Sequence, residues 1–157
     1  MGKLQVWFLT ALLVLTGCRE AATLTLANGE QRQLADYRGE WLVVNYFAEW
    51  CAPCLRELPL LNELGEAAGP AVLAVSFDAM PAQALQALQQ RLAIKVPVVA
   101  GLAGPWPFEL PRVLPTTFVL DPDGRLAERH QGELRAEDIA RWRDSYWGTR
   151  DQGMVNP

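Results

Sequence analysis

Residues 41–54, WLVVNYFAEWCAPC, decide how this chain folds. The run from Trp41 to Phe47 is apolar on both faces, which predicts a strand in the middle of a sheet. Leucines then recur at helical spacing over residues 55–64, so a helix follows the strand. Cys51 and Cys54 therefore stand at a strand-to-helix junction.

This placement suits the two cysteines to exchange a disulfide with another molecule. The first turn of a helix offers unpaired N–H groups and the positive end of the helix dipole, and both stabilise a thiolate at Cys51. Cys54 lies one turn further along the same face, within reach of Cys51. Pro53 suits the first helical turn because it has no N–H. We expect Cys51 to be the exposed nucleophile and Cys54 the shielded resolving thiol.

Two other uses of the cysteine pair fit the sequence less well. A zinc site needs two more ligands, and the remaining candidates, Cys18 and His130, are not in a paired spacing. A permanently closed structural disulfide is disfavoured by the strand–CxxC–helix context. We therefore expect no metal, and no cofactor other than a redox-active Cys51–Cys54 disulfide.

The composition of the chain is that of an ordinary globular protein. Its 157 residues suit one domain, and half of them are apolar. A formal net charge of −4 gives no support for nucleic-acid binding.

The first seventeen residues have the layout of a secretory signal. A short basic start precedes an apolar run over residues 4–16, which is too short for a comfortable membrane span. The stretch Leu15-Thr16-Gly17-Cys18 resembles the lipobox of bacterial lipoproteins. That resemblance implies cleavage before Cys18 and a lipid on its side chain, and Arg19 then favours the outer membrane. A plain signal peptide or an uncleaved anchor is the alternative.

Lipidation would also account for the number of cysteines. Cys18 would carry the membrane anchor, which leaves Cys51 and Cys54 as a pair without an odd thiol. Export would place that pair in the bacterial cell envelope, facing the periplasm, where disulfides form.

The rest of the chain alternates between strand and helix patterns. Asn28-Gly29 lies between two short alternating runs and predicts an N-terminal β-hairpin. Pro59 should kink the CxxC helix. Residues 101–112 are expected to form a packed surface loop, or else a loop near the active site. The other expected segments are strands at 71–77, 95–100, 116–120 and 125–131, helices from Pro81 to Leu92 and from Arg135 to Trp147, and a flexible tail at 149–157.

A CxxC joined to this alternation is typical of the thioredoxin-like fold. We expect residues 18–148 to form one α/β domain, with a central mixed β-sheet flanked by helices. Residues 43–54 resemble the active site of the thioredoxin superfamily, and most closely that of its TlpA/ResA-like group of exported thiol–disulfide oxidoreductases. The likeness extends to residues 28–39, to Glu57-Leu58-Pro59 and to residues 114–124, so it covers nearly all of the mature chain.

The resemblance implies roles for residues near the cysteines. Pro115 is expected to be cis, to pack beside the cysteines and to leave the backbone of Leu114 free to pair with an extended substrate. An ordinary trans proline at the start of a strand is the alternative. Trp50, Ala52 and Pro53 are expected to shape the rim of the site.

Asn45 and Glu57 are the two polar positions that the resemblance singles out. Asn45 stands where cytosolic thioredoxins carry a buried Asp, and an amide cannot titrate. Glu57 matches an acidic residue near the cysteines of the ResA-like group. Our hypothesis is that Glu57 tunes Cys54 and accepts its proton during exchange. A solvated helix glutamate is the alternative.

The sequence thus predicts a membrane-anchored, extracytoplasmic enzyme that reduces protein disulfides. The resemblance implies a membrane electron donor of the DsbD or CcdA type and clients such as apocytochrome c. Three alternatives stay open at this point: a disulfide oxidase or isomerase, a peroxidase, and a non-catalytic binding or chaperone module that uses the groove beside Pro115.

Overall fold

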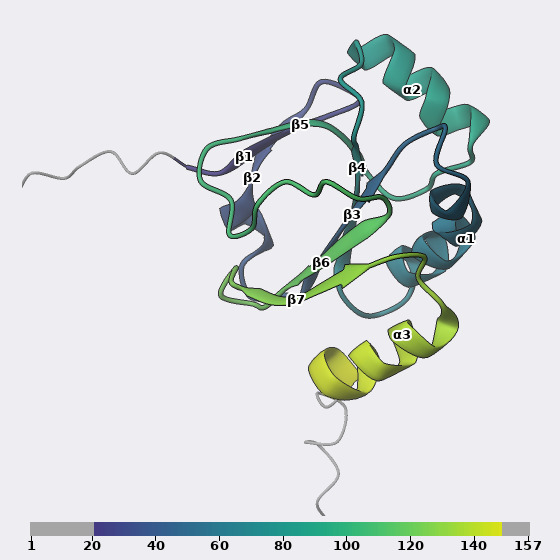
Figure 1. Ribbon diagram of the computed structural model, residues 1–157. Helices are drawn as coiled ribbons and strands as arrows, with labels where there is room; N and C mark the ends of the chain where they lie inside the picture. The colour runs from purple at the N-terminus through teal and green to yellow at the C-terminus, as the bar shows by residue number, and fades with distance from the viewer. Residues whose placement is uncertain (1–20, 149–157) are drawn as a thin grey trace, which may run out of the picture.

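A seven-stranded mixed sheet forms the centre of the protein (Figure 1). The computed structural model describes residues 21–148. The strand order is β2-β1-β5-β4-β3-β6-β7, with β3, β4 and β5 parallel and the outer strands antiparallel to their neighbours. This is the expected thioredoxin-like arrangement of a mixed sheet with flanking helices.

The elements follow one another in the predicted order. The strands are β1 Thr23–Leu26, β2 Gln31–Gln33, β3 Leu42–Phe47, β4 Ala71–Ser76, β5 Val98–Ala103, β6 Thr116–Leu120 and β7 Leu126–Gln131. The helices are α1 Ala52–Glu66, α2 Ala82–Arg91 and α3 Ala136–Trp142, together with a 3-10 turn at Leu34–Tyr37 and a π-helical turn at Arg143–Trp147.

The N-terminal hairpin forms where the sequence predicts it. Gly29 adopts a φ of 84°, a conformation that costs glycine little, and its N–H donates to the carbonyl of Leu26. β1 pairs with β2 on one side and with β5 on the other, so the hairpin extends the central sheet.

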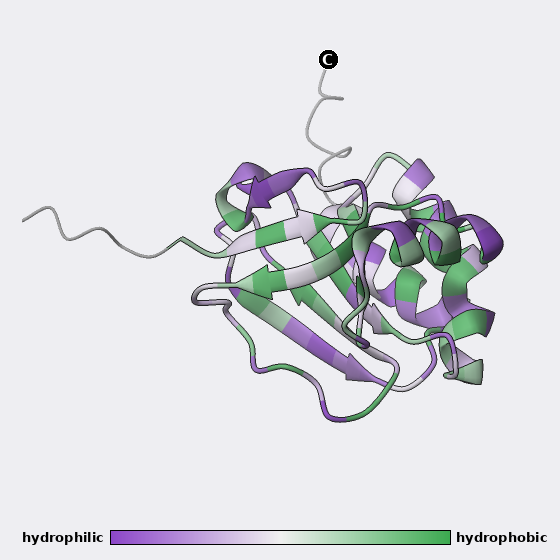
Figure 2. Ribbon diagram, turned by 90° about the horizontal axis from the view of Figure 1, so that it is seen from above, coloured by the Kyte–Doolittle hydropathy of each residue, from purple (hydrophilic) through white to green (hydrophobic). Residues whose placement is uncertain are grey.

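Strand β3 is buried along its whole length because both of its faces are covered. All three α-helices contribute to the core on one face, where Val43 and Phe47 point. On the other face Val44 and Tyr46 belong to a second apolar cluster, and Trp106 and Phe108 from the segment that follows β5 pack against that cluster. Figure 1 shows the helices gathered on one side of the sheet, and Figure 2 shows apolar residues concentrated along the central strands.

Two details differ from the sequence prediction. Strand β5 begins later than expected and includes Gly101–Ala103, because these residues pair with β1. The closing helix changes to a π-helical turn at Arg143. The CxxC helix α1 runs through Pro59 and ends at Glu66, and the kink at Pro59 stays a prediction.

The segment after β5 is a packed loop, as preferred from the sequence. The ring of Phe108 stacks on Phe118 of β6, with centroids 4.0 Å apart. No helix within residues 21–148 combines the length and apolar character needed to cross a membrane. The predicted signal segment, Cys18 and the predicted tail at 149–157 lie outside the described residues.

Candidate active site

Cys51 and Cys54 form a disulfide at the start of α1. Cys51 is the N-cap residue of the helix, and its Sγ accepts a hydrogen bond from the backbone N–H of Cys54 at 3.3 Å. Cys51 is 5% exposed and Cys54 is fully buried. The structure corrects the expectation that Cys51 is exposed. Cys51 is buried, and it is more accessible only in comparison with Cys54. Its place at the helix N-terminus is the predicted one.

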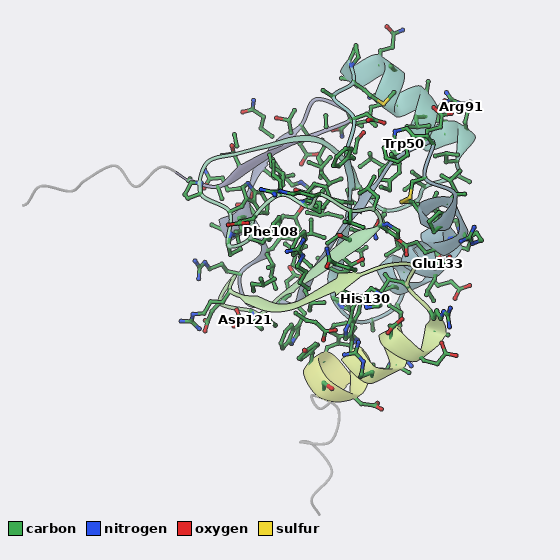
Figure 3. All side chains as sticks on the ribbon, viewed as in Figure 1. Trp50, Arg91, Phe108, Asp121, His130 and Glu133 are labelled. Atoms are coloured by element: carbon green, nitrogen blue, oxygen red, sulfur yellow. A yellow bond between two sulfur atoms is a disulfide. The ribbon has the colours of Figure 1, made fainter. Side chains whose placement is uncertain are left out.

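The rim of the site is aromatic. Trp50 is 66% exposed, its indole N–H donates to Asp78 Oδ2 at 2.8 Å, and its ring meets Phe77 edge-on. Ala52 is exposed and Pro53 half-buried. Figure 3 shows Trp50 near α2, on the side of the molecule away from His130. The wide exposure of Trp50 beside Cys51 leaves its ring available to a partner.

The peptide bond between Leu114 and Pro115 is cis, as expected. Pro115 is buried, and β6 begins at the next residue. Leu114 is half-buried and packs against both core clusters, one of which contains both cysteines. That Pro115 packs beside the cysteines stays a prediction.

Glu57 lies one turn after Cys54 on α1 and is only 1% exposed. Its Oε1 accepts from Asn45 Nδ2 at 2.7 Å, and its Oε2 accepts from the backbone N–H of Leu134 at 2.6 Å. Burial raises the pKa of Glu57 to about 7, although both hydrogen bonds act in the opposite direction. The alternative of a solvated helix glutamate is therefore wrong.

Asn45 connects Glu57 to the sheet. Its Nδ2 also donates to Thr117 Oγ1 at 2.9 Å, and Asn45 and Thr117 are directly opposite each other in the β3–β6 pair. From the sequence alone, Asn45 is recognisable only as a side chain that cannot titrate, and Thr117 and Leu134 are not among the predicted site residues. The alternation of β6 could have placed Thr117 on the same face as Asn45, whereas nothing local in the sequence brings Leu134 to Glu57.

Residues 19–129 match the sequence profile of the AhpC/TSA family. This chain belongs to that family. Among its relatives is the thiol–disulfide oxidoreductase ResA of Geobacillus kaustophilus, which is 32% identical over 134 aligned residues that cover 78% of this chain and 72% of the relative. The expected resemblance to the ResA-like group is confirmed.

Solved structures of similar proteins share the fold of this AhpC/TSA family member. A DsbF homologue from Corynebacterium diphtheriae has a TM-score of 0.61 and 28% identity, covering 81% of this chain and 84% of that one. The exposed lipoprotein thioredoxin of Streptococcus pneumoniae has a TM-score of 0.64 and 24% identity, covering 78% and 97%. Relatives of this chain are thus named thiol–disulfide oxidoreductases, and the chain itself contains a CxxC cysteine pair.

Two further polar side chains of this family member contact residues outside the cysteine motif. His130 is on β7, where its ring packs edge-on against Trp142 of α3, and Figure 3 shows it beside that helix. Glu49 pairs with Arg91 of α2 at 2.6 Å. Across residues 21–148, no three His, Cys, Asp or Glu side chains lie close enough together to hold a metal ion.

The raised pKa of Glu57 predicts how stability depends on pH. The pKa is higher in the folded chain than its ordinary value of 4.5, so the stabilising contribution is complete below about pH 4.5 and is lost as pH rises through about 7. Over that window the free energy of unfolding should fall by about 3 kcal/mol relative to Glu57→Gln. Urea unfolding of the oxidised protein at several pH values measures this difference.

The matched control is Glu63→Gln, an exposed substitution on the same helix. It should leave the pH dependence of the wild-type protein in place. If Glu57→Gln and wild type keep a constant difference in unfolding free energy across the window, the assignment of a neutralised buried carboxyl to Glu57 is wrong.

Proposed function

We propose that this protein is a thiol–disulfide oxidoreductase that reduces disulfides of other proteins through Cys51 and Cys54. The observation that carries the proposal is the Cys51–Cys54 disulfide at the N-terminus of α1, with the second sulfur fully buried. A helix N-terminus favours the thiolate of its capping cysteine, and the buried partner is sheltered from client proteins. The relatives named thiol–disulfide oxidoreductase support the same chemistry.

The reaction proceeds in two exchanges. The thiolate of Cys51 attacks one sulfur of the client disulfide, which forms a mixed disulfide and releases the other client sulfur as a thiolate. Cys54 loses its proton to Glu57, and its thiolate attacks the Sγ of Cys51. The Cys51–Cys54 disulfide forms, and the second client thiolate leaves. The client gains two electrons, and the dithiol of this protein loses them.

The aromatic rim and the start of β6 are where a client would lie. Trp50 offers an exposed ring next to Cys51, and Leu114 precedes the cis proline at the edge of the site. An extended client segment could pair with the backbone of Leu114 while its cysteine faces Cys51.

The cellular setting is part of the proposal. The lipobox-like stretch ending at Cys18 supports a lipid-anchored protein of the cell envelope, facing the periplasm, with Arg19 favouring the outer membrane. A membrane protein of the DsbD or CcdA type would return electrons to the Cys51–Cys54 disulfide, and apocytochrome c is a candidate client. Labelling with a radioactive fatty acid tests the anchor, because Cys18→Ser should remove the label.

The reduction potential of the Cys51–Cys54 couple separates reduction from oxidation. We expect a value close to the about −270 mV of thioredoxin, whereas a value close to the about −120 mV of DsbA would favour a disulfide oxidase. Equilibration with a series of dithiothreitol buffers, read by alkylation of the free thiols, gives the potential. A strongly oxidising value would contradict the proposed direction of electron flow.

A further inference from the structure

The polar side chains buried in the core include three that form one hydrogen-bonded chain. Glu57 on α1, Asn45 on β3 and Thr117 on β6 are each almost completely buried. Asn45 Nδ2 donates to Glu57 Oε1 at 2.7 Å and to Thr117 Oγ1 at 2.9 Å. Burying such groups costs free energy unless they are hydrogen-bonded. The geometry of these hydrogen bonds therefore limits which protonation states Glu57 can adopt.

In the observed orientation of the Asn45 amide, the hydrogen bonds around Glu57 suit an ionised carboxylate. The Oε2 atom faces the backbone N–H of Leu134, which can only donate. The Oε1 atom faces the amide nitrogen of Asn45, which also only donates. If Glu57 were protonated, neither of these two partners could accept a hydrogen bond from its O–H group.

An acceptor lies on the same side chain, facing the other way. Asn45 Oδ1 is buried, and none of residues 21–148 donates a hydrogen bond to it. A half-turn of the amide would exchange the positions of Oδ1 and Nδ2. Oδ1 would then lie between Glu57 Oε1 and Thr117 Oγ1, where the nitrogen lies now.

We propose that the amide of Asn45 turns by half a revolution when Glu57 gains a proton and turns back when the proton leaves. In one orientation Nδ2 donates to the carboxylate and to the Thr117 hydroxyl. In the other, Oδ1 accepts from the carboxylic acid and from the same hydroxyl, which can donate as well as accept. Each orientation makes two hydrogen bonds with Glu57 and Thr117, so neither state of Glu57 loses its partner.

The N–H of Leu134 makes this switch selective for one oxygen. Because that N–H holds Oε2 as an acceptor in both states, the proton belongs on Oε1, which faces Asn45. Asn45 is thus a positioning residue that acts through Glu57. Cytosolic thioredoxins carry a titrating carboxyl at this position of the strand. This protein carries the amide of Asn45 there, and the orientation of that amide depends on the charge of Glu57 on α1.

The charged groups around Glu57 come from two elements. Glu133, in the turn before α3, acts to raise the pKa of Glu57, and its own carboxylate is paired with Arg56 of α1 at 2.5 Å. β3 and β6 contribute the neutral side chains of Asn45 and Thr117 at this point. Cys54, one turn earlier on α1, is the thiol whose proton Glu57 would take.

The use of the switch in exchange rests on the proposed function. When Cys54 gives its proton to Glu57, the carboxylate becomes a carboxylic acid and Cys54 becomes a thiolate. The turned amide then accepts the new proton in a hydrogen bond, and it turns back once the proton has left for solvent. The buried carboxyl can thus take up and release a proton without leaving a donor unpaired on Oε1.

The test follows the side-chain resonances of Asn45 and Glu57 by nuclear magnetic resonance while Glu57 titrates in the full-length protein. We expect the Asn45 amide resonances and the Glu57 carboxyl carbon to shift with the same midpoint. Contacts of the Asn45 amide protons with the Thr117 side chain should be present at high pH and lost at low pH. Glu57→Gln should abolish the pH dependence of the Asn45 resonances. Asn45 resonances that stay constant through the titration of Glu57 would overturn the proposal.

Two variants add a functional measurement. Asn45→Leu keeps the size of the side chain but removes both the donor to the carboxylate and the acceptor from the carboxylic acid. Because a turning amide serves both states of Glu57, the Glu57 midpoint should move by less than about one pH unit. The pH profile of client reduction should stay within the same limit. Thr117→Ser keeps the hydroxyl and should leave both midpoints in place. A rise of about one to two pH units in the Glu57 midpoint of Asn45→Leu, as expected for an amide that only donates to the carboxylate, would also overturn the proposal.

These outcomes are separable from the proposed function. If the amide turns but Cys51→Ser still reduces clients, the assignment of the nucleophile fails while the switch stands. If the amide stays fixed in a protein that reduces clients through Cys51, the switch fails alone.

Discussion

Replacing Cys54 with serine is expected to leave client proteins covalently attached to Cys51. The first exchange needs only the Cys51 thiolate, whereas release of the client needs the buried thiol of Cys54, which is fully enclosed in the structure. Cys54→Ser should therefore accumulate mixed disulfides in the cell envelope and lose multiple turnover. Electrophoresis without reductant reveals the adducts, and mass spectrometry identifies the clients.

Cys51→Ser is the matched control for this experiment. It should form no adducts and should lower the rate of client reduction by at least about a thousandfold, because loss of a catalytic nucleophile costs several orders of magnitude. If Cys51→Ser instead trapped clients through Cys54, the order of attack would be reversed. If Cys51→Ser kept its biological activity, a binding or chaperone module would become the better account.

Trp142→Ala is expected to cause a large loss of stability. The indole is completely buried in the core cluster that also contains both cysteines, and it packs against the ring of His130. Removing a buried aromatic side chain leaves a cavity and costs about 3–5 kcal/mol. Urea unfolding of the oxidised variant, followed by circular dichroism, measures the change in unfolding free energy.

Trp50→Ala gives the comparison for this loss. The residue type is the same, but Trp50 is mostly exposed and contacts Phe77 and Asp78 at the rim. Its removal should change stability by less than about 1 kcal/mol while weakening client reduction. Equal destabilisation by the two substitutions would mean that α3 does not close the core as described.

The parts of the fold that could be predicted from sequence depend on local patterns. The dipeptide Asn28-Gly29 favours a tight turn between two strands, and the structure has a hairpin there. Residues 41–54 combine an unbroken apolar strand with a helix start, which fixes the position of the cysteine pair. The cis bond before Pro115 was expected from a resemblance that covers the surrounding strand and turn.

The parts that could not be predicted depend on contacts between distant segments. The register of β5 is set by its pairing with β1, so the strand extends through Gly101–Ala103, where the local sequence suggests a loop. The N–H of Leu134 reaches Glu57 from 77 positions away. Because burial decides the charge of Glu57, its environment could be established only once α1, β3 and the turn before α3 were placed together.

The central claim is that Cys51, at the N-terminus of α1, ionises more readily than an ordinary cysteine. Ultraviolet absorbance of the thiolate in reduced Cys54→Ser protein, recorded as a function of pH, tests it directly. We predict a midpoint well below the about 8.5 of a free cysteine thiol. A midpoint at or above that value would contradict the account.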